Sequence, residues 1–375
     1  MGMRSPPARS VLFVANYSPL AVSGVGQFMI DLGTRLLSSG FRVGMCYRSE
    51  VSEAPLPGRI APARLVEVRS QGVRTPGFLW RTAKTLFALR GQFAVWHVIL
   101  PQPMTALAAF LARVFGHRVV VTVFAPYPPK PNPAAQLLQR IAEWLVLRLA
   151  HVVAYESAET RRHFPIPGPV ILNGIDTVYF RPDEDRRRAL RAGAGYAPRS
   201  VVILYLGRIA RTKGIHDLLE AASGFPLQAA DARLLLVGPV EDDGLLRSGE
   251  LPPNVRLIGP VGKDDVLDHF RTADILVLPS YREGISSSLI EGMACGLPAV
   301  VSRVGGNVEV VVDGQCGYLH APGDVAGLRA HLATLIERPD LRRALGEGAR
   351  RRVLEKFTMD AMAGGYVAAY EGPVT

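Results

Sequence analysis

The sequence has few cysteines, no long uncharged apolar run and no complete dinucleotide-binding fingerprint, and each shortage excludes a class of protein. Its three cysteines, in a chain of 375 residues, are too few and too scattered for a disulfide framework or a cysteine-based metal site. They favour a reducing compartment. No apolar stretch approaches the ~20 residues that span a bilayer, and the run VLFVA at 11–15 is short for a signal peptide. We therefore expect a cytoplasmic chain that is soluble or peripheral to a membrane.

Acidic residues are scarce in the first half of the chain. Residues 1–180 hold 19 Lys and Arg against 8 Asp and Glu, whereas residues 181–375 hold 24 against 25. A basic domain attracts an anionic partner, such as a phosphorylated substrate, a lipid headgroup or a nucleic acid. The alternative is a solubility bias in an Arg-rich sequence. No helix-turn-helix, zinc-finger or RNP-like signature is present, so we do not expect a nucleic-acid partner.

Short apolar strands alternate with longer amphipathic segments, and this order predicts βαβ units and parallel sheets. The first series of expected strands is 11–15, 41–47, 63–69, 93–99 and 118–124. A second series follows a charged connector at 181–200 and comprises 201–207, 232–238, 254–259, 274–279 and 297–302. The sequence thus predicts an α/β chain of two tandem Rossmann-like, doubly wound domains, 1–180 and 181–357. A final amphipathic helix within 358–375 is expected to pack back on the first domain.

The segment SGVGQF follows the first expected strand, opens the first expected helix and contains Gly24, Val25 and Gly26. Glycines at a strand-to-helix turn let backbone N–H groups approach a phosphate closely. The motif lacks the third glycine of a dinucleotide fingerprint, and no clear ribose-binding acid ends the second strand. A tight turn that merely requires glycine explains it equally well.

The segment GRIARTKG places Gly207 and Arg208 directly after a strand and Lys213 just before a helix. An arginine and a lysine on one loop can both bind a pyrophosphate, the first as a planar fork and the second as a mobile point charge. They stand at the carboxyl edge of a parallel sheet, where doubly wound folds bind ligands. A solvated surface pair is the alternative.

The segment EGISSSLIEGMACGLP carries two glutamates at the same sheet edge, Glu283 in the expected turn and Glu291 two turns into the expected helix. Ser286 and Ser287 precede a helix, which they are placed to cap, and its N-terminal N–H groups suit an anion. Carboxylates beside a diphosphate would repel it, so functional glutamates here should accept hydrogen bonds from hydroxyl groups, as on a sugar or ribose. A loop charge at Glu283 and a solvated helical glutamate at Glu291 are the alternatives.

Together these motifs resemble the retaining GT-B glycosyltransferases of the glycogen-synthase-like and mannosyltransferase-like group, glycosyltransferase family 4, group 1. The likeness covers nearly the whole chain. Its most specific part is the combination of the GR-x4-KG loop with the E-x7-E element. The further segments that carry it are SGVGQFMIDLGTRLLSSGFRV, ILNGIDTVYFRP, NVRLIGPV, GMACGLPAV and GGNVEVVVDGQCGYL.

The resemblance implies a hexosyl transfer from a nucleotide-diphosphate sugar to an acceptor hydroxyl. In it, Arg208 and Lys213 hold the donor diphosphate and stabilise the leaving nucleotide, Glu283 contacts the transferred sugar, and Glu291 accepts from the ribose hydroxyls. These three, Glu283, Arg208 and Lys213, are the implied catalytic residues. The remaining implied donor-binding residues are Gly24, Val25, Gly26, Gly207, Gly259, Val261, Gly284, Ile285, Ser286 and Ser287.

The resemblance also implies that no metal and no other cofactor is required, because cations and backbone amides neutralise the diphosphate. The acidic runs at 183–185, 242–243 and 264–265 are accordingly interpreted as solvated loops rather than as a metal-binding motif. The proline-rich segment 126–131 is interpreted as a loop.

One departure from the family pattern concerns Phe124. Many relatives have a histidine at or near this position, facing the reacting sugar, and here His97 at the end of a different expected strand is the nearby histidine. The loss of a hydrogen-bond donor would alter donor choice or abolish turnover. Two other hypotheses therefore stay open: a binding or scaffold protein that keeps the fold without activity, and a nucleotide-sugar epimerase of related architecture.

The acceptor is expected in the first domain. The segment PGFLWRTAKTLFALRGQF carries Trp80, Phe87 and Phe93 among basic residues, as in a helix lying on an anionic membrane. An acceptor sugar that is lipid-linked, in the making of a polysaccharide, on the inner face of the plasma membrane would follow. An ordinary helix that covers the sheet is the alternative.

Overall fold

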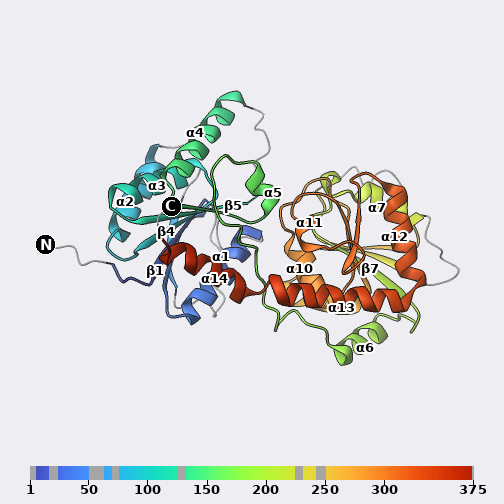
Figure 1. The fold of residues 1–375 in the computed structure, drawn as a ribbon. Coiled ribbons are helices and arrows are strands. Elements are labelled where there is room, and N and C mark those ends of the chain that lie inside the picture. The colour runs from blue at the N-terminus through green and yellow to red at the C-terminus, as the bar shows by residue number, and fades with distance from the viewer. Residues whose placement is uncertain are drawn as a thin grey trace. The chain divides into compact units, whose positions relative to one another are not determined.

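The computed structural model describes residues 6–16, 24–49, 63–69, 76–124, 132–223, 231–241 and 251–373. The chain divides into two compact units, one formed by Met1–Gly174 with Met359–Thr375 and the other by Ile175–Thr358. Each unit contains, in its described part, one six-stranded parallel sheet with helices on both faces (Figure 1). The prediction of two doubly wound α/β domains is confirmed.

The N-terminal unit has the strand order β3-β2-β1-β4-β5-β6. Its strands are β1 (Ser10–Ala15), β2 (Arg42–Ser49), β3 (Arg64–Arg69), β4 (Val95–Ile99), β5 (Arg118–Val123) and β6 (Val152–Tyr155). Its helices are α1 (Gly24–Ser38), α2 (Pro76–Leu89), α3 (Pro103–Val114), α4 (Pro133–Leu149), α5 (Ala158–Arg162) and α14 (Met359–Glu371). All pairings are parallel, as crossover helices between strands require.

Alternate residues of each strand face opposite sides, so the central strand β1 contributes to two cores. Phe13 packs in a cluster with side chains of α1 and α14, whereas Leu12 packs in a second cluster with side chains of α2, α3 and α4. Both residues are fully buried. The sheet is therefore covered by α1 and α14 on one face and by α2, α3 and α4 on the other (Figure 1).

Helix α14, the last in the sequence, is fixed to the first sheet by a buried polar network. His97 Nδ1 lies 2.7 Å from the hydroxyl oxygen of Tyr370, and His97 Nε2 lies 2.6 Å from Thr122 Oγ1. Thr122 Oγ1 also lies 2.9 Å from the hydroxyl oxygen of Tyr366. The expectation that His97 ends a strand was wrong, since it is the third residue of β4 and fully buried. Burial lowers its pKa to about 3, so the ring is neutral at physiological pH.

The C-terminal unit has the strand order β12-β11-β10-β7-β8-β9. Its strands are β7 (Val201–Leu206), β8 (Ala232–Val237), β9 (Val255–Gly259), β10 (Ile275–Leu278), β11 (Ala299–Ser302) and β12 (Gly317–His320). Its helices are α6 (Glu184–Gly193), the 3-10 turn η2 (Arg211–Lys213), α7 (Ile215–Ser223), α9 (Lys263–Thr272), α10 (Ser287–Ala294), α11 (Asn307–Val310), α12 (Val325–Glu337) and α13 (Pro339–Lys356). The described part of the central strand β7 is almost entirely buried.

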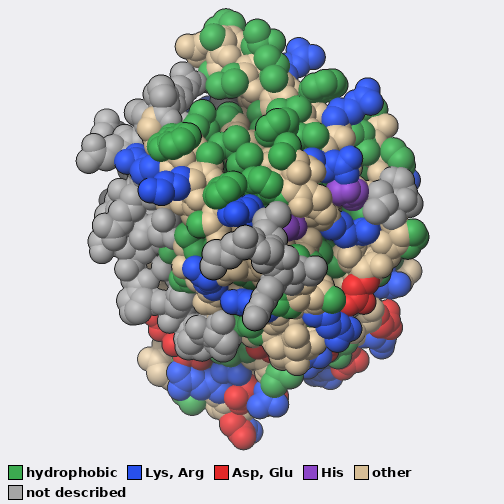
Figure 2. Space-filling view, turned by 90° about the vertical axis from the view of Figure 1, so that its left-hand side faces the viewer, with side chains coloured by type: hydrophobic (Ala, Val, Ile, Leu, Met, Phe, Trp, Pro, Cys, Tyr) green, Lys and Arg blue, Asp and Glu red, His purple; other side chains and the backbone are tan. Residues whose placement is uncertain are grey.

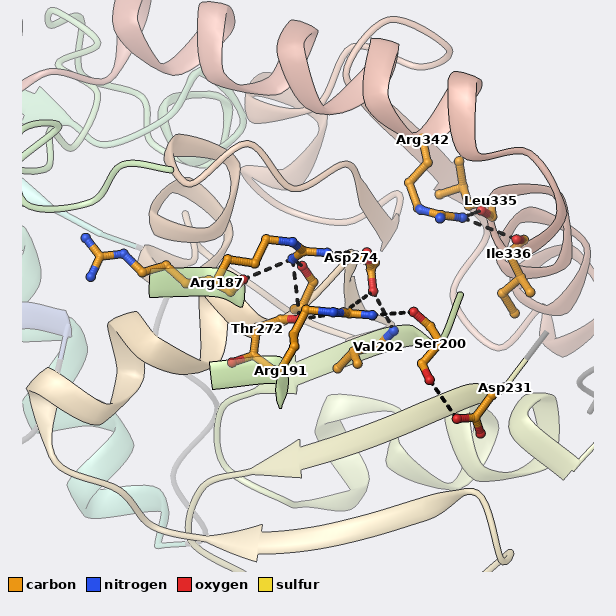
Figure 3. A network of polar contacts seen from close by, with 12 residues as sticks. Arg187, Arg191, Ser200, Val202, Asp231, Thr272, Asp274, Leu335, Ile336 and Arg342 are labelled. Carbon is orange, nitrogen blue, oxygen red and sulfur yellow. Dashed lines mark hydrogen bonds and ion pairs between the residues drawn. The ribbon is translucent and has the colours of Figure 1, made fainter. Parts of the chain in front are cut away.

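Helix α6 was predicted as part of a charged connector, and that prediction was wrong. The helix buries none of its side chains and is held instead by arginines (Figure 3). Arg187 and Arg191 both pair with Asp274, at 2.6 and 2.9 Å, and donate to backbone carbonyls at the end of α9. Ion pairs with a carboxylate thus hold this helix in place of apolar packing. Because such a helix needs no apolar face, its sequence shows no hydrophobic periodicity.

Two acidic runs interpreted as loops also lie in helices. Asp183 is the N-cap of α6 and accepts from the backbone N–H of Arg186, and Asp264 and Asp265 lie in the first turn of α9. Carboxylates in a first turn compensate the helix dipole, which explains their position. The run 242–243 and the proline-rich segment 126–131 lie outside the described residues, as does Ser23.

Candidate active site

The order of the strands in the C-terminal unit reverses between β7 and β10. In an open parallel sheet, loops that leave two adjacent strands in opposite directions open a crevice at the carboxyl edge, which is where such folds bind ligands. The loop after β7 carries Gly207, Arg208 and Lys213, and the loop after β10 carries Glu283. The two motifs that the sequence singled out therefore meet at this crevice.

Glycines allow these loops to pack backbone against backbone. Gly214 has φ +68°, and a Cβ there would lie 2.0 Å from the carbonyl oxygen of Pro279. Gly305 has φ +50°, and a Cβ there would lie 1.8 Å from the carbonyl oxygen of Glu283. A side chain at either position would push the loops apart. The backbone N–H of Tyr281 donates to the carbonyl of Thr212 at 3.0 Å, which joins the two loops directly.

Lys213 and Glu283 form an ion pair across the crevice edge. Lys213 Nζ lies 2.7 Å from Glu283 Oε1, and the side chains are only 17% and 12% exposed. Ser280 Oγ donates to the same carboxylate oxygen at 2.7 Å. Because Ser280 is fully buried and held by the hydroxyl of Ser302, the carboxylate has a fixed position. A half-buried lysine so placed can exchange this carboxylate for the phosphate of a ligand.

Arg208 takes a different partner from Lys213. Its Nη1 lies 2.9 Å from Glu241 Oε2, and both side chains are about half exposed. Beneath it, the hydroxyl of Tyr205 donates to the carbonyl of Arg208 at 2.7 Å. Burial, and next the charge of Glu283, raise the pKa of Tyr205, so its hydroxyl stays protonated and holds the loop backbone. The two cations are thus held by separate carboxylates.

Helix α10 begins at the crevice. Ser286 is its N-cap residue, but its Oγ lies 3.0 Å from Ser288 Oγ and makes no cap bond to the backbone, so the predicted side-chain cap was wrong. Ser287 is the first residue of the helix. Glu291 is its fifth, half-buried, and lies one turn in rather than the expected two. The side chain of Ile285 is nearly buried, which anchors the turn, and the carbonyl of Gly284 accepts from Gly306 N–H at 3.0 Å.

Further predicted residues lie at other loops. Gly259 ends β9 with φ +83°, its carbonyl accepts from Gly238 N–H at 2.8 Å, and Val261 follows it half-buried. In the N-terminal unit, the residues Gly24, Val25 and Gly26 form the first turn of α1, so the segment opens the first helix as predicted.

Phe124 follows β5 in the N-terminal unit, and its ring packs edge-on against Phe28 with centroids 5.2 Å apart. It lies partly buried against the core cluster that α1 and α14 share. The side chain of Phe124 therefore belongs to the apolar packing of its unit.

Sequence reasoning missed several residues that shape the crevice. Tyr281 donates from its hydroxyl to Asp217 Oδ2 at 2.7 Å, which ties the loop after β10 to α7. This hydrogen bond is the main reason that the pKa of Tyr281 is raised. Ser280 and Glu241 are the other two. The sequence signal for these three residues was weak, because a single polar residue beside a motif forms no pattern. All three do lie within a few residues of the end of a strand. Among the described residues, no group of three His, Cys, Asp or Glu is arranged to hold a metal ion.

Sequence models of two families match this chain. The family described as glycosyl transferases group 1 matches residues 187–352, and glycosyltransferase family 4 matches residues 22–179. The first match contains both crevice loops, and the two together cover most of the chain. The chain belongs to the group 1 glycosyltransferases. The family resemblance drawn from the motifs is confirmed.

Relatives of this group 1 glycosyltransferase have diverse substrates. D-inositol 3-phosphate glycosyltransferase 2 of Catenulispora acidiphila is 27% identical, with 92% of this chain and 91% of that protein covered. Among solved structures, sucrose-phosphate synthase from Thermosynechococcus elongatus has a TM-score of 0.81 at 23% identity, with 98% of both chains covered. Anabaena HepE in complex with UDP-glucose has a TM-score of 0.79 at 20% identity, with 97% of this chain and 100% of that one covered. These structures show that the group 1 glycosyltransferase has the GT-B fold.

Proposed function

We propose that this glycosyltransferase moves a hexosyl group from a nucleoside-diphosphate donor to an acceptor hydroxyl, with retention at the anomeric carbon and without a metal ion. The observation that carries the proposal is the Lys213–Glu283 pair at the point where the strand order reverses. It puts a mobile cation and a fixed carboxylate side by side at the sheet edge where doubly wound folds bind nucleotides.

The charge that develops on the departing nucleotide sets the main chemical demand. The bond from the anomeric carbon to the diphosphate oxygen breaks, and the bond to the acceptor oxygen forms on the same face of the sugar. The proton of the acceptor hydroxyl passes to the departing diphosphate oxygen. Lys213, once released from Glu283, and Arg208, once released from Glu241, supply positive charge to the diphosphate. Glu283 then accepts a hydroxyl of the transferred sugar, and Glu291 accepts the ribose hydroxyls.

The remaining predicted donor contacts belong to the same proposal. The backbone from Gly284 to Ser287 at the start of α10, and Gly207, approach the phosphates, and the loop at 259–261 flanks the base. The phosphate-binding role of residues 24–26 in the N-terminal unit is proposed with them. Because cations and amides meet the charge of the diphosphate, no metal ion enters the reaction.

The names of relatives point to the class of substrate. One is a glycosyltransferase of D-inositol 3-phosphate, and one structure holds UDP-glucose. We propose a nucleotide sugar as donor and a sugar hydroxyl as acceptor, carried on a lipid-linked or polysaccharide intermediate at the inner face of the plasma membrane. A binding protein without turnover is the second candidate, and the apolar packing of Phe124 favours it.

The test combines nucleotide binding with product analysis. Thermal unfolding is measured with UDP-, GDP- and ADP-sugars for the wild type and Glu291→Ala, with Glu347→Ala, an exposed helical glutamate of the same unit, as the matched control. A ligand at about 100 times its Kd stabilises the native state by ~2.7 kcal/mol. We expect one nucleotide class to stabilise the wild type and the control but not Glu291→Ala, and NMR of the product to show the donor's anomeric configuration.

The two candidates differ in one outcome. Binding without transfer or hydrolysis over a panel of glycan and glycolipid acceptors identifies the binding protein. An inverted product contradicts retention, and a rate that falls after treatment with EDTA and returns with a divalent cation contradicts the metal-free reaction. If no nucleotide sugar raises the unfolding temperature of the wild type, the assignment of a nucleotide sugar as donor is wrong.

A further inference from the structure

Large apolar side chains are exposed on three consecutive helices of the N-terminal unit. Of the thirteen large hydrophobic residues that are exposed in the described part of the chain, nine lie on α2, α3 and α4. They include Trp80 and Trp144, which are 73% and 61% exposed. We call this surface the outer apolar face, and its residues are Leu79, Trp80, Phe87, Phe110, Val114, Leu137, Leu138, Ile141 and Trp144.

These helices already cover the sheet with other side chains. Helix α2, for example, buries Phe78, Leu86 and Leu89, so the 73% exposed Trp80 is not needed for its packing. A helix that only covers a sheet is expected to be polar on its outer side. Contacts join α2 to α3 and α3 to α4, so the three helices form one continuous layer. The outer apolar face is therefore one surface rather than isolated exposed residues.

Basic side chains are exposed on the same three helices. The exposed cations on the three helices are Arg81, Lys84, Arg113, Arg140 and Arg148. The only acidic residue within the described parts of these helices is Glu143, and burial raises the pKa of its carboxyl, which favours the neutral form.

The cations also contact the aromatic rings. The guanidinium of Arg90, directly after α2, lies 3.6 Å from the ring centre of Phe87, and that of Arg148 lies 5.9 Å from the ring of Trp144. Figure 2 shows hydrophobic and basic side chains together over the upper part of the surface. Helix α4 lies at the top of the N-terminal unit in Figure 1.

We propose that the outer apolar face binds an anionic lipid membrane. Tryptophan and leucine side chains insert at the boundary between headgroups and acyl chains, and arginine and lysine extend their charged ends to the headgroup phosphates. Each basic residue near an anionic surface raises the affinity about fivefold. In this proposal the three helices lie along the membrane plane, because their exposed apolar side chains form one surface. No helix in the described part of the chain is long and apolar enough to cross a membrane.

The charge pattern distinguishes this partner from a second copy of the chain. Two copies that met through the outer apolar face would bring the same basic residues together, and like charges in contact oppose association. An anionic bilayer instead satisfies the apolar and the basic side chains at once. Membrane binding would bring the enzyme to a lipid-linked acceptor, and in this respect the proposal rests on the proposed function.

The experiment measures vesicle binding of the full chain without donor or acceptor, so its failure is separate from a failure of transfer. Flotation compares vesicles of phosphatidylcholine with vesicles that also contain phosphatidylglycerol. We expect binding to the anionic vesicles only, and its loss in about 1 M salt, where the Debye length is ~3 Å. Two of the three tryptophans lie on the outer apolar face and Trp96 is buried, so the fluorescence should shift to the blue on binding.

Two variants and their controls test the two kinds of contact. The double variant Trp80→Ser, Trp144→Ser should lose at least about tenfold in affinity, and Arg81→Ser with Lys84→Ser about twenty-five-fold. The matched controls are Val178→Ser with Leu354→Ser, exposed apolar residues of the C-terminal unit, and Arg188→Ser with Arg351→Ser, exposed arginines of that unit. All four variants should keep the wild-type unfolding temperature.

Three results would overturn the proposal. No binding to anionic vesicles at low salt removes the membrane as partner. Equal binding to neutral vesicles removes the role of the basic residues. A dimer in solution that the Trp80→Ser, Trp144→Ser variant dissociates, without vesicle binding, assigns the outer apolar face to a second copy of the chain.

Discussion

At the scale of single residues, Glu283 has its charge compensated before any ligand binds. Its Oε1 accepts from both Lys213 and Ser280, so an incoming diphosphate has to take Lys213 away from it. The carboxylate is then left with a buried hydroxyl as its partner and with capacity for a sugar hydroxyl. In the proposed reaction, the ion pair would thus oppose the binding of a nucleotide alone and favour a donor that carries its sugar.

The substitution Glu283→Gln should separate these two effects. Because the amide no longer holds Lys213 as an ion pair, affinity for a nucleoside diphosphate without sugar should rise, by up to about tenfold. Turnover with the intact nucleotide sugar should fall at the same time, by about 10²- to 10³-fold. Isothermal titration gives the affinity and steady-state kinetics gives the rate.

Glu347→Gln serves as the control for Glu283→Gln, since it changes an exposed glutamate of the same unit and should leave both quantities unchanged. Weaker binding of the nucleoside diphosphate to Glu283→Gln would show that the carboxylate supports the diphosphate site. In that case Lys213 is not the group that the carboxylate holds back.

The pairing of Lys213 with Glu283 could not be predicted from the sequence, although both residues were predicted from their motifs. They stand 70 positions apart, and only the order of β7 and β10 in the sheet makes their loops neighbours. From the sequence, both glutamates of the E-x7-E element were assigned to hydroxyl groups, and no counter-charge was named for either. For Glu283 the structure shows a counter-charge in a lysine from another motif.

At the scale of elements, α14 stabilises a unit whose other helices come from the start of the chain. Its buried side chains pack with those of α1, and Tyr366 and Tyr370 reach the polar network at Thr122 and His97. In this network each ring nitrogen of His97 has a hydrogen-bond partner. Apolar side chains alone would leave both nitrogens without one. Protonation would place an unpaired charge there.

The stability of the N-terminal unit should therefore fall in acid. Burial holds the pKa of His97 at about 3, below its ordinary value of 6.5, so the unfolded chain binds more protons between these pH values. The contribution of neutral His97 to the free energy of unfolding is complete above pH 6.5. It is lost as the pH falls toward 3, by at most about 1.4 kcal/mol per pH unit. Because all three tryptophans lie in this unit, urea unfolding followed by tryptophan fluorescence at pH 7 and pH 5 reports its free energy of unfolding.

The variant His97→Gln keeps one donor and one acceptor but cannot be protonated, so its free energy of unfolding should decrease less between these pH values. His163→Gln, at an exposed histidine of the same unit, should follow the wild type. Parallel pH profiles for His97→Gln and the wild type would mean that other histidines or carboxylates cause the acid sensitivity.

Elements with a strong apolar period were predictable, and those without one were missed. The strands at 201–207 and 274–279 are continuous apolar runs, and the structure has β7 and β10 there. Strands β6 and β12 were missed, and β12, with the sequence GYLH, has no continuous apolar run. Helix α4 has apolar residues on two sides, which hides its period. Helix α6 was missed because arginines rather than apolar side chains fix it.

At the scale of the whole molecule, the two units have separate sheets and separate cores. The chain passes between them twice, at Gly174–Ile175 and at Thr358–Met359. The network around Asp274 lies entirely within the C-terminal unit, where the carboxylate accepts from Arg187, Arg191 and the backbone N–H of Val202 (Figure 3). A change there tests whether the units are also separate in stability.

The substitution Asp274→Ala should destabilise the C-terminal unit alone, by about 3 kcal/mol. Removal of the carboxylate, itself 10% exposed, leaves two largely buried guanidinium groups without a counter-charge. Circular dichroism follows both units, whereas tryptophan fluorescence follows only the N-terminal one, so the two signals should separate in this variant. Asp340→Ala, at a carboxylate that is 95% exposed, should leave both unchanged. If both signals of Asp274→Ala shift together, the units unfold as one, and a nucleotide bound in the C-terminal unit would then stabilise the N-terminal unit as well.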